Sequence, residues 1–459
     1  MNILSKNFRD LGFTLGLFVL CWAAYSNCLH NEFVVDDYGL IVRNTGIRQA
    51  SDLQLNLFAP RQLGYGIDYY RPIVHGLIVV DYLLFGFNPV GYHAVNLALF
   101  FLGSWALFLV IRRISGEARL AWVTAALYAV HPINGALVNY KTMTGITLMV
   151  LCLWGSLGWL LAWREAPPKK HFLIGSVLLF ATALLCHELA VFFLLYMAAA
   201  LMFTTNVRLR ETVRMMLPFV GVLGVYLVIR FLFTGMGGNL ASKYSGPGSS
   251  LANYLTGFPV LVGWYLGKLF LPMHVVYSWG TGAGFKGQLW PAVVLGVLVL
   301  CLLVKILKVY RRGVMALSLT WLLLGLLPLL VACPIDRRAG LVIEPHWLLF
   351  SSAGFFLYAG ALVSRLIDRG RWLGWGVLVF LLTVYAWGSR THNFYWGNEV
   401  RYCRFWLEEF PENPTTKFIL AQALLRQGAV EESGQLFQGL LNGKKEDWEV
   451  YANLGLMAA

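Results

Sequence analysis

Residues 11–37 read LGFTLGLFVLCWAAYSNCLHNEFVVDD, an apolar run that ends at an acidic pair, Asp36 and Asp37. The apolar part, residues 11–24, follows a lysine and an arginine and is not followed by a clear small-residue cleavage site. This pattern is typical of a retained signal anchor whose N-terminus lies in the cytoplasm. The sequence therefore predicts a membrane span here and places the acidic pair just beyond it, on the outer side.

Composition extends this prediction to the whole chain. Hydrophobic residues make up 58% of the 459 residues and charged residues 13%, whereas a soluble domain carries about a quarter charged residues. Apolar runs of roughly 18 residues or more recur, and each is long enough to cross a hydrocarbon core as a helix. They are too long and too continuously apolar for barrel strands. The predicted fold class is an all-α polytopic membrane protein.

The distribution of charge excludes a nucleic-acid-binding protein, although the formal net charge is +13. Residues 390–459 hold seven Lys and Arg and nine Asp and Glu, so the rest of the chain carries 29 basic and 14 acidic residues. Those basic residues lie in short loops between apolar runs, as the positive-inside rule predicts. The seven cysteines are scattered without a CxxC pair, so neither a zinc site nor a disulfide framework is indicated.

The basic loops predict a topology with the N-terminus inside and the C-terminus outside. The apolar segment 254–272 is predicted to be re-entrant or interfacial, because counting it as a crossing would place the basic residues of 305–312 outside. Eleven spans are predicted, at residues 11–29, 92–111, 120–134, 144–163, 172–186, 189–204, 215–233, 289–308, 314–333, 346–364 and 372–388.

Two outer segments are long. The loop 30–91 contains an apolar stretch, 73–87, that suits a short helix lying on the membrane surface. Residues 234–253 are rich in Gly and Ser and are expected to be mobile. We predict two domains, a transmembrane domain at 1–389 and an extracytoplasmic helical tail at 390–459.

The tail carries the start of a repeat. The segment beginning at Ile419 is followed 34 residues later by a similar segment beginning at Asn453, with Gly428 in the turn between two helices. A helix-turn-helix period of this length is typical of tetratricopeptide repeats. About one and a half repeats are present, fewer than the three needed for stability alone. The tail is therefore expected to pack on the membrane domain or a partner.

On this topology the unusual polar residues gather on the outer face. Ionisable groups in or near a bilayer are costly and mark functional or paired positions. A carboxylate can act there as a general base towards a hydroxyl, and Arg, Lys and His can bind a phosphate. We assign Asp36 and Asp37 as catalytic, Arg71, Lys141, His187, Arg230, Arg337 and Arg338 as ligands of a donor phosphate, and Tyr70, His93, Asn96, His131, Glu188 and His346 as the substrate pocket.

Each assignment has a structural alternative. The acidic pair can cap the helix that follows it, Arg71 can pair with an outer-loop Asp, and the other residues can end spans, bond to one another or contact lipid headgroups. A transporter is an alternative function, but it would favour sites near the bilayer midplane between repeated halves. The membrane part shows no internal repeat and few midspan charges. A membrane scaffold that presents the tail is a further non-enzymatic alternative.

Several motifs, in their order along the chain, carry a resemblance to a known family. These motifs are FVVDDYGLIVRNTGIR at 33–48, YYRPI at 69–73, FGFNPVGYHAVNLALF at 85–100 and HPINGALVNY at 131–140. With them the sequence resembles the transmembrane O-mannosyltransferases with tetratricopeptide repeats and, more broadly, the GT-C superfamily, which includes protein O-mannosyltransferases and lipid A aminoarabinose transferases. Two later stretches, LPMHVVYSWG at 271–280 and EPHWLLFSSAGF at 344–355, look like degraded forms of the family's later motifs.

The resemblance implies an inverting transfer of a sugar from a polyprenyl-phosphate donor to an acceptor hydroxyl outside the cytoplasm. It implies Asp36 as the favoured base, with Asp37 as its neighbour. The family's Lys-Glu is His187-Glu188 here, so the cation would depend on pH. Met143-Thr144 stands where the family has Arg-Asp, which leaves the donor sugar open.

A protein acceptor is favoured, because repeat tails commonly hold peptides in a concave surface. A lipid or glycan acceptor on the same fold is the alternative. No metal or other cofactor is expected, because the monosaccharyl-phosphate branch generally needs none. The acidic pair could nonetheless hold a divalent ion, as in the oligosaccharyltransferase branch. The expected location is a bacterial inner membrane, with the site and tail on the periplasmic side.

Overall fold

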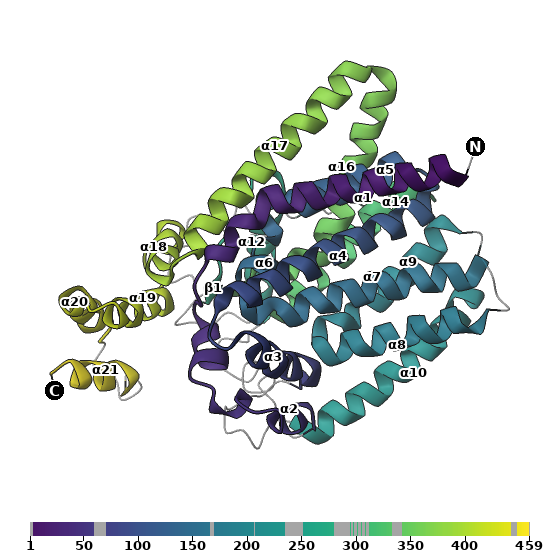
Figure 1. Ribbon diagram of the computed structural model, residues 1–459. Helices are drawn as coiled ribbons and strands as arrows, with labels where there is room; N and C mark the ends of the chain where they lie inside the picture. The colour runs from purple at the N-terminus through teal and green to yellow at the C-terminus, as the bar shows by residue number, and fades with distance from the viewer. Residues whose placement is uncertain are drawn as a thin grey trace.

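The computed structural model describes residues 3–58, 70–165, 169–205, 207–234, 251–279, 312–332, 342–441 and 448–458, with single positions at 294, 297, 301, 304 and 308. These residues form a bundle of helices with a helical tail at one end (Figure 1). The helices of the bundle are α1 (Ile3–Tyr25), α4 (Pro89–Ser115), α5 (Ala118–Val130), α7 (Thr144–Glu165), α8 (Lys170–Cys186), α9 (Phe193–Thr204), α10 (Leu209–Thr234), α12 (Leu251–Phe270), α14 (Val314–Leu324), α15 (Leu327–Ala332), α16 (Leu349–Arg369) and α17 (Arg371–Trp396).

Shorter elements connect these helices. The two-residue strands β1 (Ser278–Trp279) and β2 (Val342–Ile343) pair antiparallel. The short helices are η1 (Ser26–His30), η2 (Tyr38–Val42), η3 (Thr45–Ile47), α2 (Asp52–Phe58), α3 (Pro72–Phe85), η5 (Pro132–Asn134), α6 (Ala136–Asn139), η6 (Lys141–Met143), η7 (Glu188–Phe192) and η9 (Pro345–Leu348).

Within the described part of the chain, six helices are long and apolar enough to cross a membrane. A bent pair, Ala118–Val130 with Pro132–Asn139, makes a seventh if it is one span. Ten of the eleven predicted spans coincide with these helices or with shorter apolar ones, and the span at 289–308 lies largely outside the described residues. The chain is therefore an integral membrane protein built of helices, as predicted. The count of eleven and the re-entrant path of 254–272, which is α12, stay predictions.

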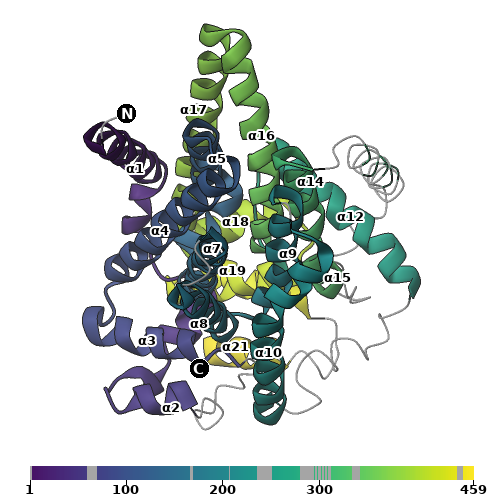
Figure 2. The ribbon, with the colours of Figure 1, turned by 90° about the vertical axis from the view of Figure 1, so that its right-hand side faces the viewer.

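α5 lies in the middle of the bundle and packs against α1, α4, α16 and α17, whereas α1, α10, α12 and α17 lie at its periphery (Figure 2). Small residues allow close approach of neighbouring helices. A Cβ at Gly360 would lie 2.6 Å from the Thr124 hydroxyl oxygen, and one at Gly354 would lie 2.3 Å from the Leu322 backbone nitrogen. Packing through small residues is how helices associate in lipid, where the hydrophobic effect does not drive association.

The predicted helix at 73–87 is present as α3, with Val80, Leu83 and Leu84 exposed, and its location on a membrane surface stays a prediction. It packs against α2, α4, α7 and α8 and buries His75 and Asp81. A charged side chain inside protein needs a partner, and Asp81 has one in Lys141. The first outer loop therefore reaches into the bundle.

The tail forms the helices α18 (Glu399–Glu409), α19 (Pro414–Arg426), α20 (Val430–Leu440) and α21 (Trp448–Ala458). Gly428, with φ of +81°, lies in the turn between α19 and α20, as predicted for a conformation that glycine adopts readily. Phe437 is fully buried in a small core with Ala421. The helical tail is confirmed, and its description as tetratricopeptide repeats stays a prediction.

Candidate functional site

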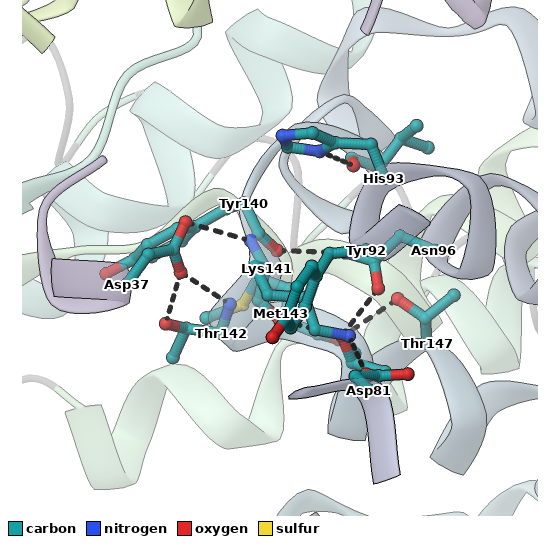
Figure 3. Close-up of polar contacts among 12 residues, drawn as sticks. Asp37, Asp81, Tyr92, His93, Asn96, Tyr140, Lys141, Thr142, Met143 and Thr147 are labelled. Carbon is teal, nitrogen blue, oxygen red and sulfur yellow. Dashed lines mark hydrogen bonds and ion pairs between the residues drawn. The ribbon is translucent and has the colours of Figure 1, made fainter. Parts of the chain in front are cut away.

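The acidic pair lies between η1 and η2, and its two carboxylates have opposite environments. Asp37 is fully buried. One of its oxygens accepts hydrogen bonds from the backbone nitrogen and hydroxyl of Thr142, at 3.0 and 2.9 Å. The other lies 3.4 Å from the backbone nitrogen of Lys141 (Figure 3), and it lies at the same distance from the backbone nitrogen of Val34. Asp37 therefore joins its own loop to η6, and its side chain does not cap η2.

Asp36 is exposed, and its backbone nitrogen lies 3.2 Å from the Tyr140 hydroxyl oxygen. Desolvation by the surrounding protein raises the pKa of Asp36, and hydrogen bonding to the Tyr140 hydroxyl opposes this shift. Burial raises the pKa of Asp37 to about 7, against the hydrogen bonds from Thr142 and Val34. A general base must reach the proton that it removes as well as have a suitable pKa. Exposure therefore favours Asp36 as the base.

A guanidinium cluster, formed by Arg71, Glu188 and Arg230, joins α3, η7 and α10. Arg71 donates from Nε and Nη2 to the two oxygens of Glu188, at 2.9 and 2.7 Å. Arg230 Nη1 lies 3.6 Å from the same carboxylate and 3.0 Å from the Tyr226 hydroxyl. The three side chains are 22%, 30% and 16% exposed, respectively. Two guanidinium groups thus converge at a position that solvent reaches, and Glu188 is a partner of both among the described residues.

His187 lies beside this cluster and caps η7. Its Nδ1 accepts the backbone N–H of Leu189 at 3.2 Å, so the neutral ring carries its proton on Nε2. Burial, followed by the positive charge of Arg71, lowers the pKa of His187 to about 3. At neutral pH His187 is therefore neutral, and it can act towards a phosphate only as a hydrogen-bond donor.

Contacting side chains connect Asp36 with the guanidinium cluster. The Tyr140 ring lies 5.8 Å from the Tyr277 ring, between centroids. The Tyr277 hydroxyl is 3.1 Å from Nδ1 of His346, whose ring centroid lies 6.2 Å from that of His187. The sequence predicts that Asp36, His187 and His346 lie on the outer face, and the fold connects them with the guanidinium cluster in one continuous region.

Lys141 and Asn96 belong to a buried network (Figure 3). Lys141 Nζ lies 2.5 Å from Asp81 Oδ2, and the two side chains are 1% and 4% exposed. Asn96 donates to the carbonyl of Tyr140 at 3.2 Å and accepts from the Thr144 hydroxyl at 2.5 Å. These bonds hold the segment that precedes α7. For Lys141 to bind a donor phosphate, its pair with Asp81 would have to open.

Two predicted pocket residues, His93 and His131, are fully buried. His131 uses both ring nitrogens on backbone groups, since Nδ1 accepts from Ile133 and Nε2 lies 3.2 Å from the Leu269 carbonyl oxygen. This arrangement agrees with the alternative that His131 ends a span. His93 Nδ1 lies 3.4 Å from the Val138 carbonyl oxygen, and its Nε2 has no hydrogen-bond partner among the described residues.

Tyr70 stacks on Phe233 of α10, with ring centroids 4.8 Å apart, so it lies next to the guanidinium cluster. Arg337, Arg338 and most of the Gly- and Ser-rich segment 234–253 lie outside the described residues. In the part that the structure describes, no three His, Cys, Asp or Glu side chains gather as a metal site. The absence of a metal cofactor stays a prediction.

Three residues of this region were not assigned from the sequence: Tyr140, Tyr277 and Glu399. Tyr140 ends the motif HPINGALVNY, and Tyr277 lies in LPMHVVYSWG, so motif membership was the available signal. Glu399 lies in the tail without a motif. Only the tertiary structure shows that it belongs to this region, because α18 packs on the acidic loop and Glu399 accepts a hydrogen bond from Val35.

Comparison with known proteins agrees with the motifs. The chain is 31% identical over 190 residues to Protein O-mannosyl-transferase Tmtc1 of Drosophila melanogaster, over 40% of this chain and 22% of that protein. It is 35% identical over 117 residues to Protein O-mannosyl-transferase TMTC1 of Homo sapiens, over 24% of this chain and 13% of that protein. The resemblance is thereby confirmed. The matched part spans about a fifth or less of these relatives, and no family model matches the chain.

Among solved structures, the chain is similar to ArnT from Cupriavidus metallidurans bound to undecaprenyl phosphate. The TM-score is 0.43 at 13% sequence identity, over 96% of this chain and 76% of that one. A TM-score below 0.5 does not establish a shared fold.

Proposed function

We propose that this chain is an inverting GT-C glycosyltransferase that moves a sugar from a polyprenyl-phosphate donor to an acceptor hydroxyl on the outer face of a membrane. The observation that supports it most is the connection of an exposed carboxylate, Asp36, to the guanidinium cluster through contacting side chains. Such a transfer needs a base near the acceptor and a cationic site for the leaving phosphate. Sequence similarity to proteins named O-mannosyl-transferases supports the same class of reaction.

In the proposed step, the acceptor oxygen attacks C1 of the sugar as the bond between C1 and the phosphate oxygen breaks. Asp36 takes the hydroxyl proton, and polyprenyl phosphate leaves with the bonding electron pair, so the configuration at C1 inverts. Arg71 and Arg230 stabilise the charge that develops on the phosphate, because guanidinium groups match phosphate geometry. Glu188 holds both guanidinium groups in place. Lys141, which is bound to Asp81, supports the loop instead.

The proposed acceptor is a protein, in keeping with the helical tail and with the names of the relatives. The donor sugar stays open, and mannose is the first to test. The bacterial inner membrane and the periplasmic orientation stay predictions.

A deletion strain tests this proposal. Mass spectrometry would compare the glycoproteins and glycolipids of the strain carrying an empty vector, the wild-type gene or Asp36→Asn. We expect a glycoprotein modification that the wild type restores and Asp36→Asn does not. Loss of a glycolipid modification with every glycoprotein unchanged would assign a lipid acceptor. Restoration by Asp36→Asn would remove Asp36 as the base, and a deletion without any glycan change would favour a transporter or scaffold.

A further inference from the structure

The first tail helix, α18, contacts the loop that carries Asp36. Glu399, at the start of α18, is 4% exposed, and its Oε1 accepts a hydrogen bond from the backbone nitrogen of Val35 at 2.8 Å. Its Oε2 forms an ion pair with Arg426, the last residue of α19. Side chains from two tail helices thus meet one residue before the proposed base.

Val35 has an uncommon backbone conformation, with φ of +52°. A β-branched residue in this region is strained, and such strain persists only where the surroundings impose it. Here three successive N–H groups donate to three different side chains: Val34 to Asp37, Val35 to Glu399 and Asp36 to Tyr140. These bonds fix the direction in which the Asp36 side chain leaves the backbone.

Other contacts join the tail to the same loop. The Arg426 guanidinium lies 4.4 Å from the centroid of the Tyr38 ring. The backbone nitrogen of Glu32 donates to the Gly397 carbonyl at 3.3 Å, and the Asn398 amide donates to the Glu32 carboxylate at 3.2 Å. Residues from the start of the tail and from the end of α19 therefore contact the acidic loop on both sides of Asp36.

We propose that Glu399 is a positioning residue for Asp36, acting through the N–H of Val35, and that the first tail helices are part of the active site. Arg426 in turn orients Glu399. The inference rests on the proposed function, because it takes Asp36 as the base. It also means that deleting the tail would disturb the base as well as any acceptor surface, so a tail deletion cannot by itself identify the acceptor.

Two substitutions of Glu399 separate positioning from simple stabilisation of the tail. Glu399→Ala removes the acceptor of the Val35 N–H and the charge that binds Arg426. Glu399→Gln removes the charge and keeps an amide oxygen that can accept from Val35. Arg404→Ala is the matched control, since Arg404 lies on the same helix and pairs at 3.0 Å with Glu432 on the surface, away from the acidic loop.

The first measurement is hydrogen–deuterium exchange of residues 31–43 in the full chain, in lipid nanodiscs. We expect Glu399→Ala to speed exchange in this segment by about tenfold, as for the loss of one protecting bond. Glu399→Gln should restore most of the protection, and Arg404→Ala should leave it unchanged. If Glu399→Gln exchanges as fast as Glu399→Ala, or if neither changes exchange, Glu399 does not act through Val35 and the inference is wrong.

The second measurement is transfer kinetics with undecaprenyl-phosphate mannose or other undecaprenyl-phosphate hexoses as the donor. Glu399→Ala should lower kcat by about 10- to 100-fold, as a small misplacement of a catalytic group does, and should leave the donor KM unchanged. Glu399→Gln should recover most of kcat. If kcat of Glu399→Ala equals that of Arg404→Ala, the inference fails. If the wild type transfers none of these sugars, the proposed function fails, and the exchange result still decides whether Glu399 holds the loop.

Discussion

The buried ion pair of Lys141 and Asp81 offers a direct test of how the site is built. Nζ and Oδ2 lie 2.5 Å apart, and the two side chains are almost fully enclosed. Lys141→Met keeps most of the aliphatic length but leaves a carboxylate buried without its ion-pair partner. Removing one partner of a buried pair costs about 3–5 kcal/mol.

Proton uptake sets an upper limit to this cost. A lone buried carboxylate can lose its charge by binding a proton. At pH 7 this costs about 4 kcal/mol, because an ordinary aspartate has a pKa of about 3.9 and each unit corresponds to about 1.36 kcal/mol. At pH 5 it costs only about 1.5 kcal/mol. The folded variant then binds a proton that the unfolded chain does not, so its stability relative to the wild type rises as the pH falls.

The free energy of unfolding can be measured by SDS titration in mixed micelles at both pH values. We expect Lys141→Met to lose up to about 4 kcal/mol at pH 7 and less than half of that at pH 5. The double variant Asp81→Asn with Lys141→Met removes both charges, so it should regain most of the stability, and the double-mutant cycle gives the coupling.

One result would refute this interpretation of Lys141. If Lys141→Met unfolds like the wild type at both pH values and loses only the binding of undecaprenyl-phosphate sugars, then Lys141 faces the donor phosphate. The assignment of Lys141 to loop support would then be wrong, and the original prediction of a phosphate ligand would stand.

Three further predictions follow from the site. Asp36→Asn should abolish transfer without changing the free energy of unfolding, since Asp36 is exposed. Asp37→Asn should keep transfer, but its free energy of unfolding should fall by about 1–3 kcal/mol, because the amide nitrogen of Asn would face backbone N–H groups. Turnover assays with SDS titration check both, and the reverse pattern would exchange their roles. Arg71→Lys should raise the donor KM by about tenfold or more, since an ammonium group cannot form the bidentate pair that holds Arg71 on Glu188. An unchanged donor KM would exclude Arg71 from the phosphate site. The pKa of Asp36 is raised, and the carboxyl must lose its proton before it can act as a base. We therefore expect kcat/KM to rise with pH along an acid limb above about pH 4, and an acid limb at or below that pH would contradict a raised pKa of the base.

Much of the fold could be predicted from the sequence because lipid imposes a simple rule. A segment of apolar residues must be helical in a bilayer to satisfy its backbone, so ten predicted spans coincide with helices. The outer loop was harder, since its environment depends on long-range partners. The stretch at 73–87 is a helix as predicted, and what could not be predicted is the buried pair between its Asp81 and Lys141, 60 residues apart.

For the candidate site too, some residues could be predicted from the sequence, and others depend on tertiary contacts. Local motifs marked Asp36, Arg71 and Glu188, because charged residues beside apolar spans are conspicuous in any sequence of this class. The resemblance favoured Asp36 as the base by its position, but the burial of Asp37 could not be predicted, since it arises from contacts such as the hydrogen bonds of Thr142 to Asp37.

The sequence by itself determined that this protein is helical, crosses a membrane and carries an acidic pair beyond its first span. These properties depend on composition and on the spacing of apolar runs, which are local. Only the tertiary structure decided that Glu399 of the tail supports the loop of Asp36 and that Arg71 shares Glu188 with Arg230. Such pairings depend on which helices pack together, and no single segment of the chain contains that information.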